Sequence, residues 1–203
     1  MTEFIAQLAA EHNVQVVMGG LQGAVGVEGM TGPDRTIFLD PNLFPPRMNF
    51  RFCHELAHVL LGHVDAQNPT PEMEHDADEL ASELLLPSSV FRLAARRLDL
   101  KGLKDEFPHA SWEAIGRKLL DVMPAVLTIW DDRKLTRRIG SPDLNFPSKP
   151  TRNEKEIADS LFEGMGDHAT SRSPRSRITS DAWFVDEGTG VKRVVMITQV
   201  EEE

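Results

Sequence analysis

Apolar residues recur every three or four positions over much of the chain, which is the spacing of an amphipathic helix. The most apolar of these stretches begins at Pro45-Pro46 and ends at Gly62. A second, acidic stretch runs from about residue 72 to residue 86 and is followed by Pro87. Shorter helices are predicted over four other segments: 2–12, 88–98, 103–107 and 112–120.

Other segments alternate in polarity or are rich in β-branched residues, and these predict strands. Residues 14–27 are rich in valine but interrupted by glycines, and residues 35–40 alternate. Residues 166–180 are rich in serine and arginine, so we expect a flexible loop there. Four more strands are predicted, the first two as a hairpin: 126–130, 135–139, 183–185 and 191–200.

These elements predict an α+β fold with two parts. The first part, residues 1–122, would place a small antiparallel sheet from residues 14–40 behind the two long helices, followed by a helical segment from about 88 to 122. The second part, residues 123–203, would be a β-containing C-terminal region.

Charge is distributed unevenly along the 203 residues, whose formal net charge is −10. Residues 1–87 hold 3 Lys or Arg against 13 Asp or Glu, whereas residues 88–140 hold 11 against 7. The acidic first block argues against direct nucleic-acid binding. The first basic residue is Arg35, Cys53 is the one cysteine, and no apolar run approaches about 18 residues. We therefore expect no secretory signal, no membrane association and a cytoplasmic location.

The sequence His54-Glu55-Leu56-Ala57-His58 lies inside the apolar helix and carries the clearest chemistry in the chain. A spacing of four residues places both imidazoles on one helical face, where they can bind one metal ion. Glu55 lies about 100° round the helix and can reach a metal-bound water as a general base. A buried helix does not carry such polar residues without a polar purpose, so we predict that His54 and His58 bind a catalytic zinc ion, Zn2+.

A catalytic zinc ion needs a third protein ligand and an open position for water. Glu74 and Asp78 share one face of the acidic helix, so Glu74 can bind the metal and Asp78 can accept the N–H of a ligand imidazole. Asp76 is an alternative ligand that lies about 200° from Glu74 on a regular helix, and His63 is another. The chain contains no Tyr, so a histidine or an arginine would have to help zinc stabilise an oxyanion.

Two segments resemble the ImmA/IrrE family of intracellular zinc metallopeptidases. Phe52 to His63 carries the His-Glu-Leu-Ala-His sequence, and Glu74 to Pro87 is similar to the family signature E-x-E-A-N-x-F-A-x-x-L-L-M-P. The resemblance covers about residues 35–142 and continues through Phe107 to Ile115. The chain departs from the signature at three positions, where the family has Glu, Asn and Phe: Asp76, Asp78 and Leu80.

The resemblance implies a zincin-like minimal metallopeptidase core. Carried over by position, the zinc ligands would be His54, His58 and Glu74, the base would be Glu55, and Asp78 would support a ligand imidazole. Members of the family typically cleave helix-turn-helix transcriptional repressors, which releases stress-response, phage or mobile-element genes. The resemblance therefore implies a zinc endopeptidase whose partner is a helix-turn-helix repressor.

Two other hypotheses stay open at this point. The basic residues of the segment 88–120 could serve a DNA-binding regulator, although no recognition helix rich in Asn, Gln, Arg and Lys is evident there. Alternatively, the chain could be a non-catalytic, zinc-stabilised interaction module of a toxin–antitoxin pair. Bound-metal analysis distinguishes a DNA-binding regulator from a zinc enzyme. Cleavage of a co-expressed repressor distinguishes the enzyme from a non-catalytic interaction module.

Overall fold

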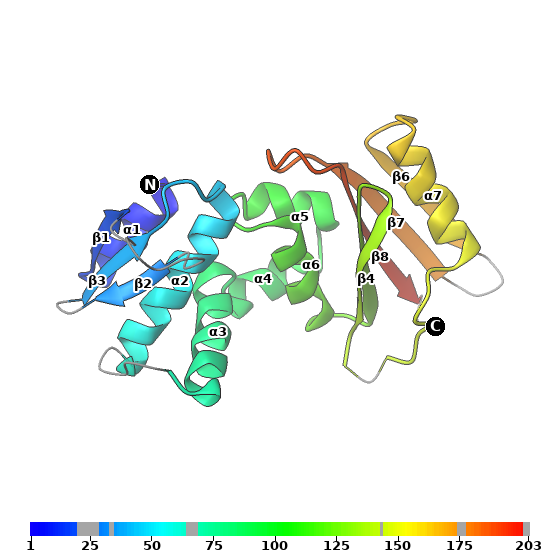
Figure 1. Cartoon of the computed structure of the whole chain (residues 1–203). Helices are drawn as coiled ribbons and strands as arrows, with labels where there is room; N and C mark the ends of the chain where they lie inside the picture. The colour runs from blue at the N-terminus through cyan, green and yellow to red at the C-terminus, as the bar shows by residue number, and fades with distance from the viewer. Residues whose placement is uncertain (20–28, 33–34, 64–68, 143, 174–177, 201–203) are drawn as a thin grey trace. The chain divides into compact units, whose positions relative to one another are not determined.

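The structure is a computed structural model that describes the whole chain except residues 20–28, 33–34, 64–68, 143, 174–177 and 201–203. The chain divides into two compact units (Figure 1). The first unit comprises Met1–Phe91 and Phe107–Ala110, and the second comprises Arg92–Glu106 and Ser111–Glu203. Helices and strands occur in both units, so the predicted α+β class is confirmed.

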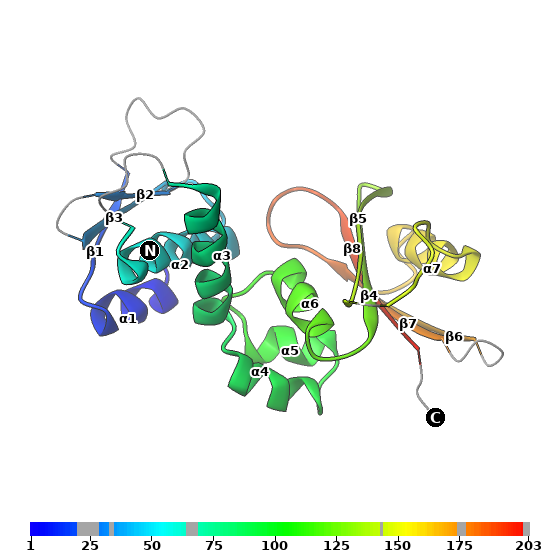
Figure 2. The same ribbon diagram turned by 90° about the horizontal axis from the view of Figure 1, so that it is seen from below.

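The first unit packs three helices and a three-stranded sheet around one core (Figures 1 and 2). Strand β3 lies in the middle of the sheet, antiparallel to β2 and parallel to β1. The antiparallel pairing expected for residues 14–40 is thus found between β2 and β3, and β1 makes the sheet mixed. The part of the predicted strand 14–27 that follows residue 19 lies outside the described residues. The elements are α1 (Glu3–Glu11), β1 (Gln15–Met18), β2 (Gly29–Gly32), β3 (Thr36–Leu39), α2 (Pro45–Leu61) and α3 (Pro71–Leu85).

Helix α2 runs through the centre of this unit. Pro45 and Pro46 occupy its first positions, where a missing N–H removes no helical hydrogen bond. Gly62 ends it in the left-handed conformation, with φ of 76°. Met48, Asn49 and every side chain from Phe52 to Val59 are buried, because α1, α3, β2 and β3 all pack against the helix.

Helix α3 lies beside α2 (Figure 2). Thr70 caps its N-terminus by accepting a hydrogen bond from the backbone N–H of Met73. Ala77 and Ala81 are fully buried, and their small side chains let the two helix backbones approach closely. The first turns of α3 therefore lie next to the His-Glu-Leu-Ala-His turns of α2, which is the arrangement that the candidate site needs.

The second unit is built on a five-stranded antiparallel sheet with the order β5-β4-β8-β7-β6. Helices α6 and α7 cover opposite faces of this sheet (Figure 2), so β4 is buried on both sides. Gly116 lets α6 approach β4, since a Cβ atom there would lie 2.8 Å from Leu127 Cδ1. Helix α4 (Ser88–Ala95) spans the division between the units, and the other elements are α5 (Leu100–Glu106), α6 (Trp112–Leu120), β4 (Ala125–Asp131), β5 (Lys134–Gly140), α7 (Arg152–Phe162), β6 (His168–Ser173), β7 (Ile178–Val185) and β8 (Arg193–Val200).

A buried ion pair lies between α7 and the sheet. Arg138 Nη1 lies 3.1 Å from Glu154 Oε1, and both side chains are almost fully buried. Burial opposes ionisation of Glu154, but hydrogen bonds from the Thr151 backbone N–H and the Thr198 hydroxyl, together with Arg138, outweigh it and hold the pKa of Glu154 below its ordinary value. Because each charge has partners, the ion pair is compensated within the second unit, where its role is structural.

The C-terminal region differs from expectation in two places. Helix α7 was not predicted, although Thr151 and Glu154 form a capping box at its start. The prediction of a flexible loop over 166–180 is wrong for residues 168–173, which form β6, and for residues 178–180, which begin β7. Pairing with β7 makes β6 a strand even though its sequence, HATSRS, is polar. Residues 174–177 of that predicted loop lie outside the described residues.

Candidate metal centre

Helix α2 brings His54 and His58 together, as their spacing indicated. The two rings lie edge to face with centroids 4.8 Å apart, and their Nε2 atoms are separated by 3.2 Å. Only 6% of the His54 side chain and 8% of the His58 side chain are exposed. Two buried imidazoles therefore direct one nitrogen each toward the same point.

Glu74 completes this group from the first turn of α3. Its Oε2 atom lies 3.3 Å from His54 Nε2, and its Oε1 atom lies 3.5 Å from His58 Nε2. Within the described residues, these three side chains are the His, Cys, Asp or Glu group whose ligand atoms all lie within 4.8 Å of one another. The Glu74 side chain is 47% exposed, so the group opens to solvent on the side of α3.

The two imidazole nitrogens and the Glu74 carboxylate are close enough together to hold one zinc ion. Ligand distances of about 2.0–2.2 Å in a tetrahedral site place neighbouring donor atoms about 3.3–3.6 Å apart. The two Nε2 atoms are 3.2 Å apart, and each faces a different oxygen of the Glu74 carboxylate, His54 at 3.3 Å from Oε2 and His58 at 3.5 Å from Oε1. Two imidazole nitrogens and one carboxylate oxygen are also a typical donor set of catalytic zinc sites, which keep a fourth position for water.

The outer nitrogens of both imidazoles have partners as well. His54 Nδ1 lies 2.9 Å from Asp78 Oδ1, so the imidazole donates and the carboxylate accepts. This hydrogen bond leaves the Nε2 lone pair of a neutral His54 directed at Glu74 and His58. His58 Nδ1 lies 3.1 Å from His63 Nδ1, a contact that the sequence analysis did not foresee. The feature of the sequence that accompanies this contact is Gly62, which ends α2 in the left-handed conformation and is followed directly by His63.

Burial adjusts the protonation of His58. Desolvation and the neighbouring His54 lower its pKa below the ordinary value of 6.5, and they outweigh the opposing effect of Glu74 and Glu55. A lowered pKa keeps His58 neutral at physiological pH, and the neutral form is the one that binds a metal.

Glu55 follows the first histidine and is 7% exposed. It lies close enough to His58 to affect its pKa, yet it does not belong to the group of three ligand atoms. The Glu55 carboxylate is thus close to His58 but lies outside the candidate ligand group of His54, His58 and Glu74. Its role as a general base stays a prediction.

Of the two alternative ligands that the sequence offered, His63 contacts His58 and Asp76 lies elsewhere. Asp76 is exposed and is not part of the three-residue group. His75 is also exposed and pairs with Glu79 on the same helix, at 3.4 Å. Cys53 is fully buried next to His54 in the chain, and burial raises the pKa of its thiol far above the usual range. This environment favours an inert, space-filling thiol over a redox sensor.

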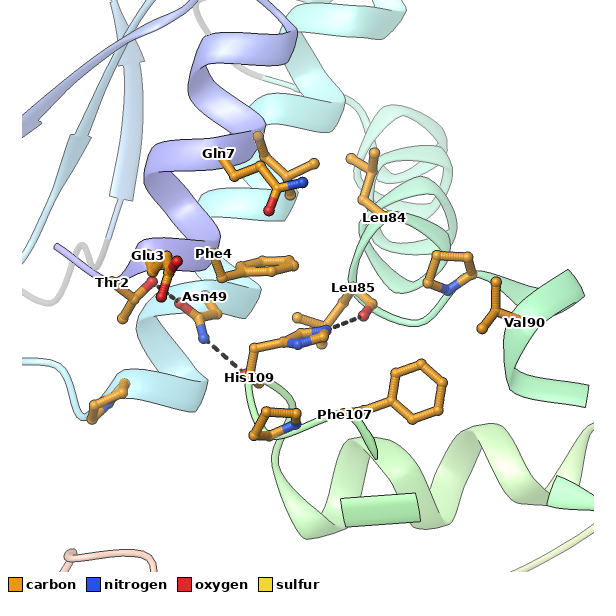
Figure 3. Close-up of a pocket in the computed structure, with 14 residues that line it drawn as sticks. Thr2, Glu3, Phe4, Gln7, Asn49, Leu84, Leu85, Val90, Phe107 and His109 are labelled. Atoms are coloured by element: carbon orange, nitrogen blue, oxygen red, sulfur yellow. Dashed lines mark hydrogen bonds between the residues drawn. The ribbon is translucent and has the colours of Figure 1, made fainter. Parts of the chain in front are cut away.

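A separate apolar cavity of about 610 Å³ lies in the same unit, lined by α1, the start of α2, the end of α3 and residues 107–109 (Figure 3). His109 stacks on Phe4 with ring centroids 4.3 Å apart and donates a hydrogen bond from Nε2 to the Leu85 carbonyl at 2.8 Å. The Asn49 amide donates to the His109 carbonyl at 2.8 Å. None of His54, His58 and Glu74 lines this cavity, and through these contacts His109 joins α1, α2 and α3.

Comparisons with known proteins agree with this arrangement. A Mycobacterium tuberculosis transcriptional regulator of known structure has the same fold, with a TM-score of 0.63 and 17% identity over 97% of this chain and 68% of its own. A search of curated proteins found no match. Among the helices that the structure describes, none combines the length and the apolar character of a membrane span.

The family is shown by the first half of the chain. Residues 9–119 match the Peptidase_M78 family, described as the IrrE N-terminal-like domain. The matched range contains the whole three-residue group as well as Glu55 and Asp78. It is the family that the motif resemblance in α2 and α3 indicated, and this chain belongs to it.

Proposed function

We propose that the protein is a zinc-dependent endopeptidase that cleaves a helix-turn-helix transcriptional repressor. The observation that carries the proposal is the convergence of His54, His58 and Glu74 into one group of possible metal ligands, with Glu55 close to His58. Membership of a peptidase family supports the same reaction class.

Each residue of the site has a distinct task in this proposal. His54, His58 and Glu74 would hold the zinc ion, which supplies an acidified water and polarises the scissile carbonyl. Glu55 accepts a proton from the attacking water and delivers it to the leaving amine nitrogen. Its low exposure keeps bulk water away from the carboxylate, while Asp78 fixes the orientation of His54.

Charge supports a basic protein as the substrate. The first compact unit carries 3 Lys or Arg against 13 Asp or Glu, so its net charge is −10. DNA-binding domains carry clustered Lys and Arg, and an acidic peptidase unit attracts such a partner while it repels DNA itself. The second unit carries 19 residues of each sign and gives no support to direct nucleic-acid binding.

The biological setting is part of the same proposal. The structural neighbour is a transcriptional regulator, and this is compatible with a role in gene regulation. Cleavage of a repressor would release stress-response, phage or mobile-element genes. A repressor acts on the chromosome, which places the peptidase in the cytoplasm.

Co-expression with helix-turn-helix repressors from the same genome tests the proposal. Cells would carry the wild type, Glu55→Gln or the control Glu79→Gln, which replaces an exposed glutamate of α3. Mass spectrometry of new N-termini should show cleavage with the wild type and the control, and no cleavage with Glu55→Gln. An intact repressor in all three strains, with zinc bound to the protein, would favour a non-catalytic interaction module.

A further inference from the structure

Directly after α2 the chain places a third histidine, His63, beside His58, one of the three candidate ligands. Gly62 adopts the left-handed conformation that ends the helix, and His63 follows it. The His63 ring lies against that of His58, with centroids 5.3 Å apart and planes inclined by 59°. Their Nδ1 atoms are 3.1 Å apart, which is a hydrogen-bond distance. No His63 nitrogen belongs to the group of three ligand atoms.

The two nitrogen atoms of the His58 ring have different neighbours. Its Nε2 atom is directed at His54 Nε2 and Glu74 Oε1, at 3.2 and 3.5 Å, and its Nδ1 atom is directed at His63. A neutral imidazole has one N–H group and one lone pair. When the Nε2 lone pair of His58 binds a metal, the proton must lie on Nδ1. His58 then donates from Nδ1, and His63 must accept with its own Nδ1 lone pair.

We propose that His63 is a positioning residue that fixes the tautomer and the ring orientation of His58 for metal binding. The inference rests on the proposed metal centre and adds a residue to it. Asp78 makes the equivalent contact to His54, so each ligand imidazole is held by a different acceptor, a carboxylate on α3 or an imidazole after α2. Partners of this kind typically change metal affinity by about 10–100-fold when they are removed.

Two substitutions at position 63 test whether His63 acts as the hydrogen-bond acceptor of His58. His63→Leu removes the acceptor, whereas His63→Asn places an amide oxygen near the position of Nδ1 and restores it. His75→Leu is the matched control, because His75 is an exposed histidine whose ion-pair partner is Glu79 on its own helix. His63 is itself partly exposed, so the variants are expected to fold, and the unfolding temperature of the metal-free proteins verifies this.

Two readouts are measured on the full chain. Competition with a chromophoric chelator gives the Zn2+ affinity, and NMR of the Co2+-loaded protein shows the exchangeable Nδ1–H proton of each ligand imidazole as a strongly shifted signal. We expect His63→Leu to weaken Zn2+ binding by about 10-fold or more and to lose the His58 N–H signal to exchange with water. His63→Asn and His75→Leu should stay close to the wild type in both readouts.

Other outcomes would overturn the inference in recognisable ways. Unchanged Zn2+ affinity and a retained His58 signal in His63→Leu would show that His63 does not position the ring. A changed Co2+ absorption spectrum in both His63→Leu and His63→Asn would show that His63 is itself a ligand. Wild-type protein that binds neither Zn2+ nor Co2+ would remove the proposed metal centre, and this inference with it.

Discussion

Replacing Glu74 by alanine should weaken zinc binding by about 10²-fold. Four-ligand zinc sites bind with about 10–16 kcal/mol, or about 2.5–4 kcal/mol for each ligand, and 1.4 kcal/mol corresponds to a factor of about ten. The Glu74 side chain is 47% exposed, so water can partly replace it and the lower end of the range applies. The two Nε2 atoms, 3.2 Å apart, would then be the remaining protein donors.

Two neighbouring substitutions on α3 provide the comparison, and Asp76→Ala is the control. Asp76→Ala removes the same charge two residues away but leaves the three-residue group intact, so zinc affinity should stay near that of the wild type. Asp78→Ala removes the acceptor at 2.9 Å from His54 Nδ1 and should weaken binding by about 10–100-fold. Comparing Glu74→Ala with Asp76→Ala therefore separates loss of a ligand from loss of charge.

Metal titration of the three purified variants against a chelator of known affinity measures these differences. Circular dichroism of the metal-free proteins checks that α3 is intact. Near-native affinity in Glu74→Ala, combined with a large loss in Asp76→Ala, would refute the assignment of the third ligand. It would mean that α3 is rotated relative to the structure described above.

Three further predictions concern single residues. Glu55→Gln should lower peptidase activity by at least about 10²-fold while zinc affinity is retained, because an amide cannot accept the proton; cleavage at the native rate would contradict this. Glu154→Gln should reduce the free energy of unfolding by about 3 kcal/mol at neutral pH, since Arg138 is left buried without its partner, and denaturant titration measures the loss. The pKa of Glu154 in the folded protein lies below its ordinary value of 4.5, so ionised Glu154 stabilises the fold above pH 4.5. This contribution to the free energy of unfolding disappears as the pH falls through the folded-state pKa, and Glu154→Gln should lack this pH dependence. Cys53 should react slowly with iodoacetamide in the native protein and quickly in denaturant, because burial raises its pKa, and fast native labelling would argue against the packing of α2.

The candidate site could be predicted from the sequence because most of its geometry is local. His54 and His58 are four residues apart on one helix, and Glu74 and Asp78 are four apart on the next, so helical periodicity places each pair on one face. The structure brings these two faces together. The contact between His63 and His58 was missed because it depends on a left-handed residue after the helix, and helical periodicity carries no information beyond Gly62.

The fold was less predictable where elements depend on distant partners. Strand β6 has a polar sequence and is a strand because it pairs with β7. The parallel pairing of β1 with β3 is a matter of topology, which the alternation of side chains does not encode. Helix α7 has few apolar positions, but the capping box at Thr151 and Glu154 was a readable signal of its start.

The proposed function depends on one zinc ion bound by the two histidines of α2 and the glutamate of α3. An anomalous difference map at the zinc edge, from crystals of the zinc-loaded protein, tests it most directly. We expect one peak at about 2.0–2.2 Å from His54 Nε2, His58 Nε2 and a carboxylate oxygen of Glu74, with a water in the remaining position. A map without a peak at this position, or with zinc bound by other residues, would contradict the account.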